Sequence, residues 1–202
     1  MAGSTLAVAA AALASLAGCA QTPDTLSGTY ANPDHGPPRV VAPVSARQAA
    51  KGPPPAPSCP LEVTAIVDGR HVRDALGSVS GRTVRAPADQ EAWLRSVIFG
   101  LGSRGFALSQ AGPGAPVSGA LSARFTLQNA WVSSVASNKV ADVIWHVDAT
   151  RDGTSVISKD YRGASNRMNW SSGDDELQGI VNRAFAQALD AMAVDLREQC
   201  PK

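Results

Sequence analysis

Apolar and polar residues alternate in three segments of the chain, 61–67, 121–128 and 142–149. Every second residue is apolar in each of them, which predicts strands with one buried face. The Asp152-Gly153 pair that follows the third segment favours a tight hairpin turn, so a further strand is expected to run from there to about Arg162. One-sided alternation of this kind is typical of antiparallel strands with one solvent-exposed face.

Apolar residues recur at three- and four-residue spacing in two other segments, which predicts two helices. The first begins after Pro87 and ends near Gly102, and the second begins near Ser172 and carries apolar residues as far as Leu196. Residues 69–86 are polar and rich in glycine, and they are interpreted as a long loop or an irregular hairpin. The sequence therefore predicts an α+β fold, with an antiparallel sheet of about four to five strands and two helices packed on one face.

The amino-terminal region has a different pattern, an apolar run of 11 residues from Leu6 to Leu16. A membrane-spanning helix needs about 20 residues, so this run is too short to span a bilayer. A short apolar segment followed by small residues is typical of a secretory signal. The stretch Leu16-Ala17-Gly18-Cys19 resembles the lipobox of bacterial lipoproteins, in which the cysteine is diacylated and the preceding peptide is removed. A cleaved secretory peptide without lipid is the alternative.

The resemblance to the lipobox implies a location as well as a lipid. Ala20 follows the cysteine, whereas the inner-membrane retention signal has aspartate at that position. The lipobox therefore implies an anchor in the outer membrane, on its periplasmic face, with palmitate-like chains on Cys19.

The same features divide the chain into three parts. Residues 1–18 are expected to be the lipoprotein signal peptide, residues 19–58 a lipidated cysteine with a proline-rich flexible tether, and residues 59–202 a single periplasmic domain. The segment 20–58 contains nine prolines and few apolar side chains, so it cannot bury enough surface to fold alone. As a flexible coil it would span about 35 Å.

The charge balance excludes one class of partner. The chain has 18 Lys and Arg against 17 Asp and Glu. Without a basic excess we expect no nucleic-acid partner and no charge-driven recruitment to an anionic surface.

Besides Cys19 the chain has two cysteines, Cys59 and Cys200, and they flank the predicted domain. In an oxidising periplasm they are expected to form a disulfide. Two free thiols at the ends of the domain are the alternative.

Two groups of polar residues are candidates for catalysis. The segment from Asp68 to Asp74 could hold an acid–base pair, or it could be a solvated strand end with local ion pairs. A second group, Asp142, His146 and Asp148, lies at even spacing on one strand face. These residues could form a catalytic triad or simply lie on the solvent-exposed face of the sheet. No nucleophile elbow of the Gly-x-Ser-x-Gly type accompanies them. We therefore predict no catalytic residue and no enzyme.

Metal and cofactor sites are not expected either. The three histidines, His35, His71 and His146, are scattered along the chain, and two cysteines cannot complete a ligand set. Among the tryptophans, Trp131 and Trp170 do not fall on predicted core faces. They are candidates for an interaction surface, because indole is often enriched at interfaces.

Short stretches between residues 61 and 197 support a family resemblance. They are Val67-Asp68-Gly69-Arg70, Leu76-Gly77, Trp93-Leu94, Arg104-Gly105-Phe106, Ala141-Asp142-Val143, Lys159-Asp160-Tyr161-Arg162 and Asn169-Trp170 with the segment 177–196. The pattern resembles the uncharacterised bacterial lipoproteins typified by YajG. The resemblance implies an outer-membrane lipoprotein without known catalytic residues; the tether and the pair of cysteines are not carried over from that family.

The chain is also similar, more coarsely, to the auxiliary lipoproteins of ABC-type lipid transport systems. The sequence thus predicts a non-enzymatic, lipid-anchored domain that binds another cell-envelope component, an unidentified protein or lipid. The alternative is an auxiliary lipoprotein of a lipid or solvent transporter, which would bind transporter partners or an apolar ligand.

Overall fold

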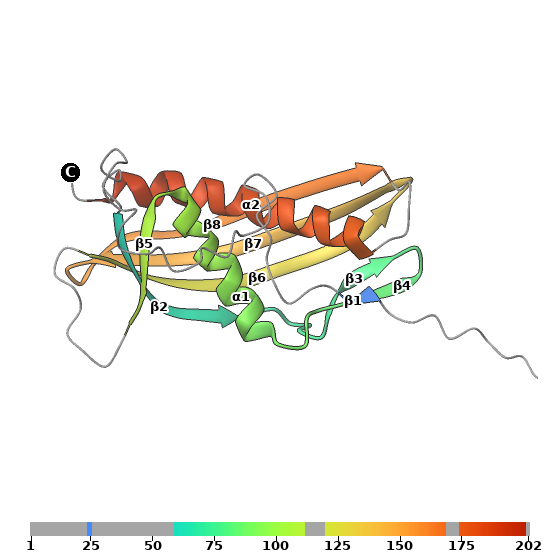
Figure 1. Cartoon of the computed structure of the whole chain (residues 1–202), viewed down its shortest axis with the longest axis horizontal. Coiled ribbons are helices and arrows are strands. Elements are labelled where there is room, and N and C mark those ends of the chain that lie inside the picture. The colour runs from blue at the N-terminus through green and yellow to red at the C-terminus, as the bar shows by residue number, and fades with distance from the viewer. Residues whose placement is uncertain (1–23, 26–58, 112–119, 169–173, 201–202) are drawn as a thin grey trace, which may run out of the picture.

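The computed structural model describes residues 24–25, 59–111, 120–168 and 174–200 (Figure 1). The elements in chain order are β1 (Asp24–Thr25), β2 (Cys59–Asp68), β3 (Ala75–Val79), β4 (Arg82–Arg85), α1 (Gln90–Phe99), the 3₁₀ helix η1 (Gly100–Arg104), β5 (Phe106–Gln110), β6 (Leu121–Val135), β7 (Asn138–Arg151), β8 (Thr154–Met168) and α2 (Asp174–Glu198).

Three long strands form the main part of the sheet. β6, β7 and β8 have 15, 14 and 15 residues, and β7 pairs antiparallel with both β6 and β8. The other edge of β6 carries two strands end to end, both parallel to it: β2 pairs with the first half of β6 and β3 with the second half. β5 extends the sheet beyond β2, and β4 followed by β1 extends it beyond β3.

The predicted sheet was wrong in size and in strand direction. The sheet is mixed and has eight strands, whereas the sequence predicted an antiparallel sheet of four to five. Parallel pairs need a crossover connection, and the one between β2 and β5 includes α1. Of the two interpretations of residues 69–86, the irregular hairpin is confirmed, since β3 and β4 pair antiparallel with a register shift between Ala75 and Gly77. Alternation predicts which face of a strand is buried, but not the direction of its neighbour.

Both helices lie on one face of the sheet, here called the inner face (Figure 1). α2 lies along β7 and β8, and α1 lies against β2. The helices meet through Trp93 of α1 and Phe185 of α2, whose ring centroids are 5.3 Å apart, and Phe185 also lies 6.2 Å from the ring of Trp145 on β7. All three side chains are buried in one continuous apolar core. Neither helix packs on the opposite, outer face.

The sheet has two distinct ends (Figure 1). At one end β3, β6 and β8 finish and β4 and β7 begin; we call it the turn end, because it holds the β3–β4 and β6–β7 turns. The backbone N–H of Ser80 donates to Ser134 Oγ at 3.1 Å, which ties these two turns together. At the other end lie the β7–β8 turn, the start of β2 and the last turn of α2, and we call it the disulfide end.

Candidate functional site

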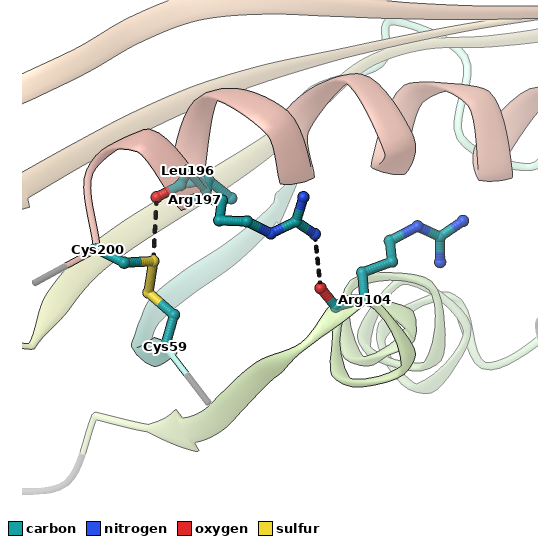
Figure 2. Close-up of a disulfide and its surroundings, with 5 residues drawn as sticks. All are labelled: Cys59, Arg104, Leu196, Arg197 and Cys200. Carbon is teal, nitrogen blue, oxygen red and sulfur yellow. Dashed lines mark hydrogen bonds between the residues drawn. A yellow bond between two sulfur atoms is a disulfide. The ribbon is translucent and has the colours of Figure 1, made fainter. Parts of the chain in front are cut away.

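The disulfide between Cys59 and Cys200 that the sequence predicted is present, with the two Cα atoms 5.6 Å apart (Figure 2). It joins the first residue of β2 to the second residue after the end of α2. Nearby, the guanidinium of Arg197 donates to the backbone oxygen of Arg104 at 2.9 Å, so α2 is also tied to η1. The bridge links segments 141 residues apart and fastens α2 to the sheet.

The predicted lipidation residue, Cys19, lies outside the described residues, and so does Trp170. The structure does describe one short piece of the segment expected to be a tether. Asp24 and Thr25 form β1, an edge strand parallel to β4, with Asp24 opposite Val84 and Thr25 opposite Arg85.

A polar cluster occupies the disulfide end of the outer face. His146 on β7 contacts two carboxylates: its Nδ1 lies 2.6 Å from Asp160 and its Nε2 lies 3.1 Å from Asp148. The hydroxyl of Ser158 donates to Asp148 at 2.8 Å. The hydrogen bond to Asp160 is the main cause of a raised His146 pKa, and the hydroxyl of Ser158 is the main cause of a lowered Asp148 pKa.

This cluster is not arranged as a nucleophile with its base. Ser158 bonds to the carboxylate and not to the imidazole, and both ring nitrogens of His146 already face carboxylates. A serine nucleophile needs an imidazole nitrogen within hydrogen-bond reach of its hydroxyl. Asp142, the third residue of the hypothetical triad, pairs instead with Arg162 at 2.6 Å. The cluster joins the accessible faces of two neighbouring strands, β7 and β8.

The segment that begins at Asp68 holds a buried ion pair. Arg70 is only 5% exposed, and its guanidinium donates to both oxygens of Asp68 at 2.9 and 2.7 Å. The same group donates to the backbone oxygen of Arg73 and lies 5.8 Å from the ring centroid of Trp93. The acid–base hypothesis for this segment is not supported at Asp68, because both oxygens of its carboxylate accept hydrogen bonds from Arg70. The pair connects the β2–β3 loop to α1.

Two further polar contacts anchor α2 to the sheet. Lys139 on β7 is fully buried, and its Nζ lies 2.8 Å from Glu176 near the start of α2. Near the other end of α2, Asp195 accepts hydrogen bonds from Lys159 at 2.8 Å and from Tyr161 at 2.9 Å. Burial raises the pKa of Tyr161, and the bond from Lys159 lowers that of Asp195. These contacts are structural, since each joins a strand to the helix that covers it.

A small cleft lies between α1 and β2. Its volume is about 190 Å³, and its lining includes Val63, Ile66, Phe99 and the charged side chain of Arg95. Pockets for small molecules usually measure about 300–1,000 Å³. The cleft can therefore hold a short apolar group, but not a whole lipid.

Exposed apolar side chains gather at the turn end of the outer face. Trp131 is 45% exposed, Val135 57% and Met168 50%, and we call these three residues the turn-end patch. Val135 and Met168 lie in one row of the sheet, since both pair with Asn138 of β7. The sequence singled out Trp131 but missed the other two.

Metal-binding and membrane-crossing features were also sought in the described residues. Nowhere in these ranges do three His, Cys, Asp or Glu side chains come together as a metal site would require. Neither described helix has the length and hydropathy needed to cross a bilayer.

Comparison with known proteins gives a likeness of coarse fold. No family model and no curated protein matches the sequence. Among solved structures, the chain is similar to protein XCC0632 from Xanthomonas campestris, of family-model DUF330, with 11% identity, a TM-score of 0.49, and coverage of 72% of this chain and 89% of that one.

Two other similar structures are lipoproteins. A minor lipoprotein from Acinetobacter baumannii has 9% identity and a TM-score of 0.41, covering 71% of this chain and 96% of that one. Lipoprotein GNA1162 from Neisseria meningitidis has 11% identity and a TM-score of 0.35, covering 69% and 99%. Bacterial lipoproteins thus occur among the structures that this chain resembles.

Proposed function

We propose that the protein is a lipid-anchored lipoprotein of the bacterial cell envelope, held at the periplasmic face of the outer membrane, and that its domain binds another envelope component without catalysis. The observation that carries the proposal is Cys19 directly after Leu16-Ala17-Gly18, at the end of a short apolar run. Two or three acyl chains on one residue anchor a protein firmly, since each buried CH₂ contributes about 0.8 kcal/mol.

The described residues support a secreted binding domain in two ways. The disulfide suits an oxidising compartment such as the periplasm. The polar cluster around His146 has its hydrogen-bonding groups directed at one another, with Ser158 bonded to a carboxylate and not to the imidazole. A binding role needs only an exposed surface, and the outer face of the sheet supplies one.

Metabolic labelling tests the anchor. Cells expressing the full chain are grown with labelled palmitate, and the chain is isolated from the outer and inner membranes separately. We expect label in the wild-type chain, in the outer-membrane fraction, and none in Cys19→Ser. Equal labelling of the two chains would refute lipidation at this residue, and label confined to the inner membrane would refute the location.

A partner is sought in the same cells by crosslinking and isolation of the intact chain. We expect a specific envelope protein or lipid to be recovered with the wild-type protein and lost with Trp131→Ser, while the exposed residue Thr154 at the disulfide end supplies the control variant Thr154→Ser. Recovery of nothing across growth conditions would count against a binding role.

The cleft beside α1 favours a second candidate function, that of an auxiliary lipoprotein in a lipid or solvent transport system. Its apolar residues, Ile66 and Phe99, could contact a short acyl or solvent-like group. Native mass spectrometry of the gently purified chain tests this candidate, because a bound lipid would appear as added mass. If no added mass were found and Phe99→Ser recovered the same partners as the wild-type chain, the cleft would be excluded as a ligand-binding site.

A further inference from the structure

The short strand β1 indicates where the amino-terminal segment reaches the domain. β1 is parallel to β4, and β4 begins at the turn end and runs away from it. The amino-terminal end of β1 therefore faces the turn end (Figure 1). Asp24 itself lies opposite Val84, two residues after the start of β4 at Arg82.

The distance from β1 to the proposed lipid is short. Cys19 stands five residues before Asp24, and an extended chain spans at most about 3.6 Å per residue. Residue 19 thus lies within about 18 Å of Asp24. The segment 26–58 does not add to this distance, because it follows β1 in the chain.

The outer face near this point carries large exposed apolar side chains among polar ones. At the turn end, Val135 and Met168 share a row with Asn138, the next outer row holds Ser133, Val140 and Asn166, and Trp131 shares its row with Asp142 and Ala164. The carboxylate of Asp142 is paired with Arg162. At the disulfide end the outer rows contain Arg124, Asp148, His146 and Asp160. Of these two ends, the turn end therefore exposes the larger apolar side chains, and tryptophan is typical of membrane–water interfaces.

We propose that the pairing of β1 with β4 holds the turn end of the sheet against the bilayer, with the turn-end patch in contact with the lipid surface. This inference rests on the proposed anchor at Cys19. The occupant of the patch is the membrane itself, because the lipid-bearing residue lies within reach of the patch's end of the sheet. The disulfide end and the cleft beside α1 are then turned toward the periplasm.

Fluorescence quenching on vesicles tests this contact. In the chain that begins at Cys19, this cysteine is the only one outside the disulfide, so a maleimide-bearing phospholipid can be coupled to it directly. The coupled protein is placed on phosphatidylcholine and phosphatidylglycerol vesicles that carry a nitroxide-labelled lipid. The coupled lipid replaces the natural acylation, so the quenching experiment does not depend on lipidation in cells. A failure of the metabolic labelling and a failure of the quenching can therefore be told apart.

The matched control is Trp131→Phe. Trp93 and Trp145 are fully buried, and Trp170 is common to both proteins, so the difference between them reports Trp131. We expect nitroxide quenching in the wild-type protein and its loss in Trp131→Phe. Equal quenching of the two proteins would overturn the inference. It would also be overturned if Trp131 were not quenched and the protein formed dimers through the turn-end patch.

Two insertions distinguish the role of β1 from that of a plain tether. A 20-residue Gly/Ser linker, with a mean span of about 25 Å, is inserted either between residues 21 and 22 or between residues 40 and 41. The first lies before β1 and the second after it. We expect quenching of Trp131 to be lost with the first insertion and kept with the second. Equal effects of both would show that residues 20–58 act as one tether and would overturn the proposed orientation.

Discussion

Helix α2 comes close to the sheet at Gly163 on β8, and the substitution Gly163→Ala tests this approach. A Cβ at this position would lie 1.8 Å from the backbone oxygen of Ala184 and 2.8 Å from the backbone nitrogen of Ala188, both in α2. Contacts between carbon and oxygen are ordinarily about 3.3–3.6 Å long. The helix or the strand must therefore move by more than about 1 Å, since neither backbone atom can rotate away.

The magnitude follows from what that movement disturbs. Phe185 and Ala188 lie in the same turns of α2 and are fully buried in the core. Overpacking a tight core costs about 1–3 kcal/mol, and the clash here is with backbone on both sides. We expect Gly163→Ala to lower the free energy of unfolding by about 3 kcal/mol. At about 3 °C per kcal/mol for a domain of this size, the melting temperature would fall by about 10 °C.

Urea denaturation of the oxidised chain, followed by tryptophan fluorescence, measures this loss. Gly179→Ala on α2 is the matched control, because its Cβ would meet no atom closer than 3.8 Å. Alanine is the better helix former, so this control should gain about 0.5–1 kcal/mol. A Gly163→Ala protein within about 0.5 kcal/mol of wild type would refute direct contact of α2 with β8 at this point.

Three other changes probe the remaining contacts. Lys139→Met leaves the carboxylate of Glu176 buried and should lower the free energy of unfolding by about 3 kcal/mol. In urea titration, adding Glu176→Leu to this variant should restore part of the lost stability. An unchanged free energy of unfolding in Lys139→Met would refute the pairing. Replacing Cys59 and Cys200 by alanine should cost up to about 5 kcal/mol and abolish the effect of reductant on the melting temperature. His146 has a raised pKa in the folded state, so protonation of its imidazole stabilises the fold. This stabilisation is fully present below pH 6.5 and is lost as the pH rises through the folded-state pKa. The pH dependence of the melting temperature should lose this part in His146→Gln.

The features that the sequence predicted correctly are local ones. The Asp152-Gly153 turn is predictable because both residues adopt positive φ, 49° and 78°, which the aspartate–glycine pair tolerates. The first helix begins at Gln90, just after Asp89, whose side chain accepts a hydrogen bond from the backbone N–H of Ala92. Such signals depend on neighbours a few residues away, so a single sequence contains them.

The parallel pairs depend on contacts far apart in the chain, and the glycines near them left two interpretations open. Gly77 contributed to the prediction of a loop or an irregular hairpin at residues 69–86, and the hairpin is present. In the structure it lies in β3, with φ of 120°, and a Cβ there would come 2.0 Å from the backbone oxygen of Val132 on β6. Glycine permits this close approach of two strands. The same residue type serves loops and crowded strands, so composition alone cannot separate the two.

The exposure of Trp131 could be predicted from the sequence, while its role in an interaction surface stays a prediction. Trp131 was singled out because it falls outside every core-facing pattern, and it is exposed. Val135 and Met168 were missed because apolar residues at strand ends look the same in sequence whether they are buried or exposed. Their common row on the outer face follows from strand register, which the sequence did not supply.

Arg70 shows why the polar segment after β2 could not be interpreted from composition. A run of charged residues usually marks a solvated loop, yet this guanidinium is buried between Asp68 and Trp93. Burial of arginine is tolerated where a carboxylate binds it with two hydrogen bonds, because that partner offsets much of the lost hydration. Here the partner is two residues away, while the aromatic ring comes from α1. The pair lies between the end of β2 and the start of β3, where the chain passes from one half of β6 to the other. The charged segment therefore supports the mixed sheet, and its role depends on a tertiary contact that only the folded chain contains.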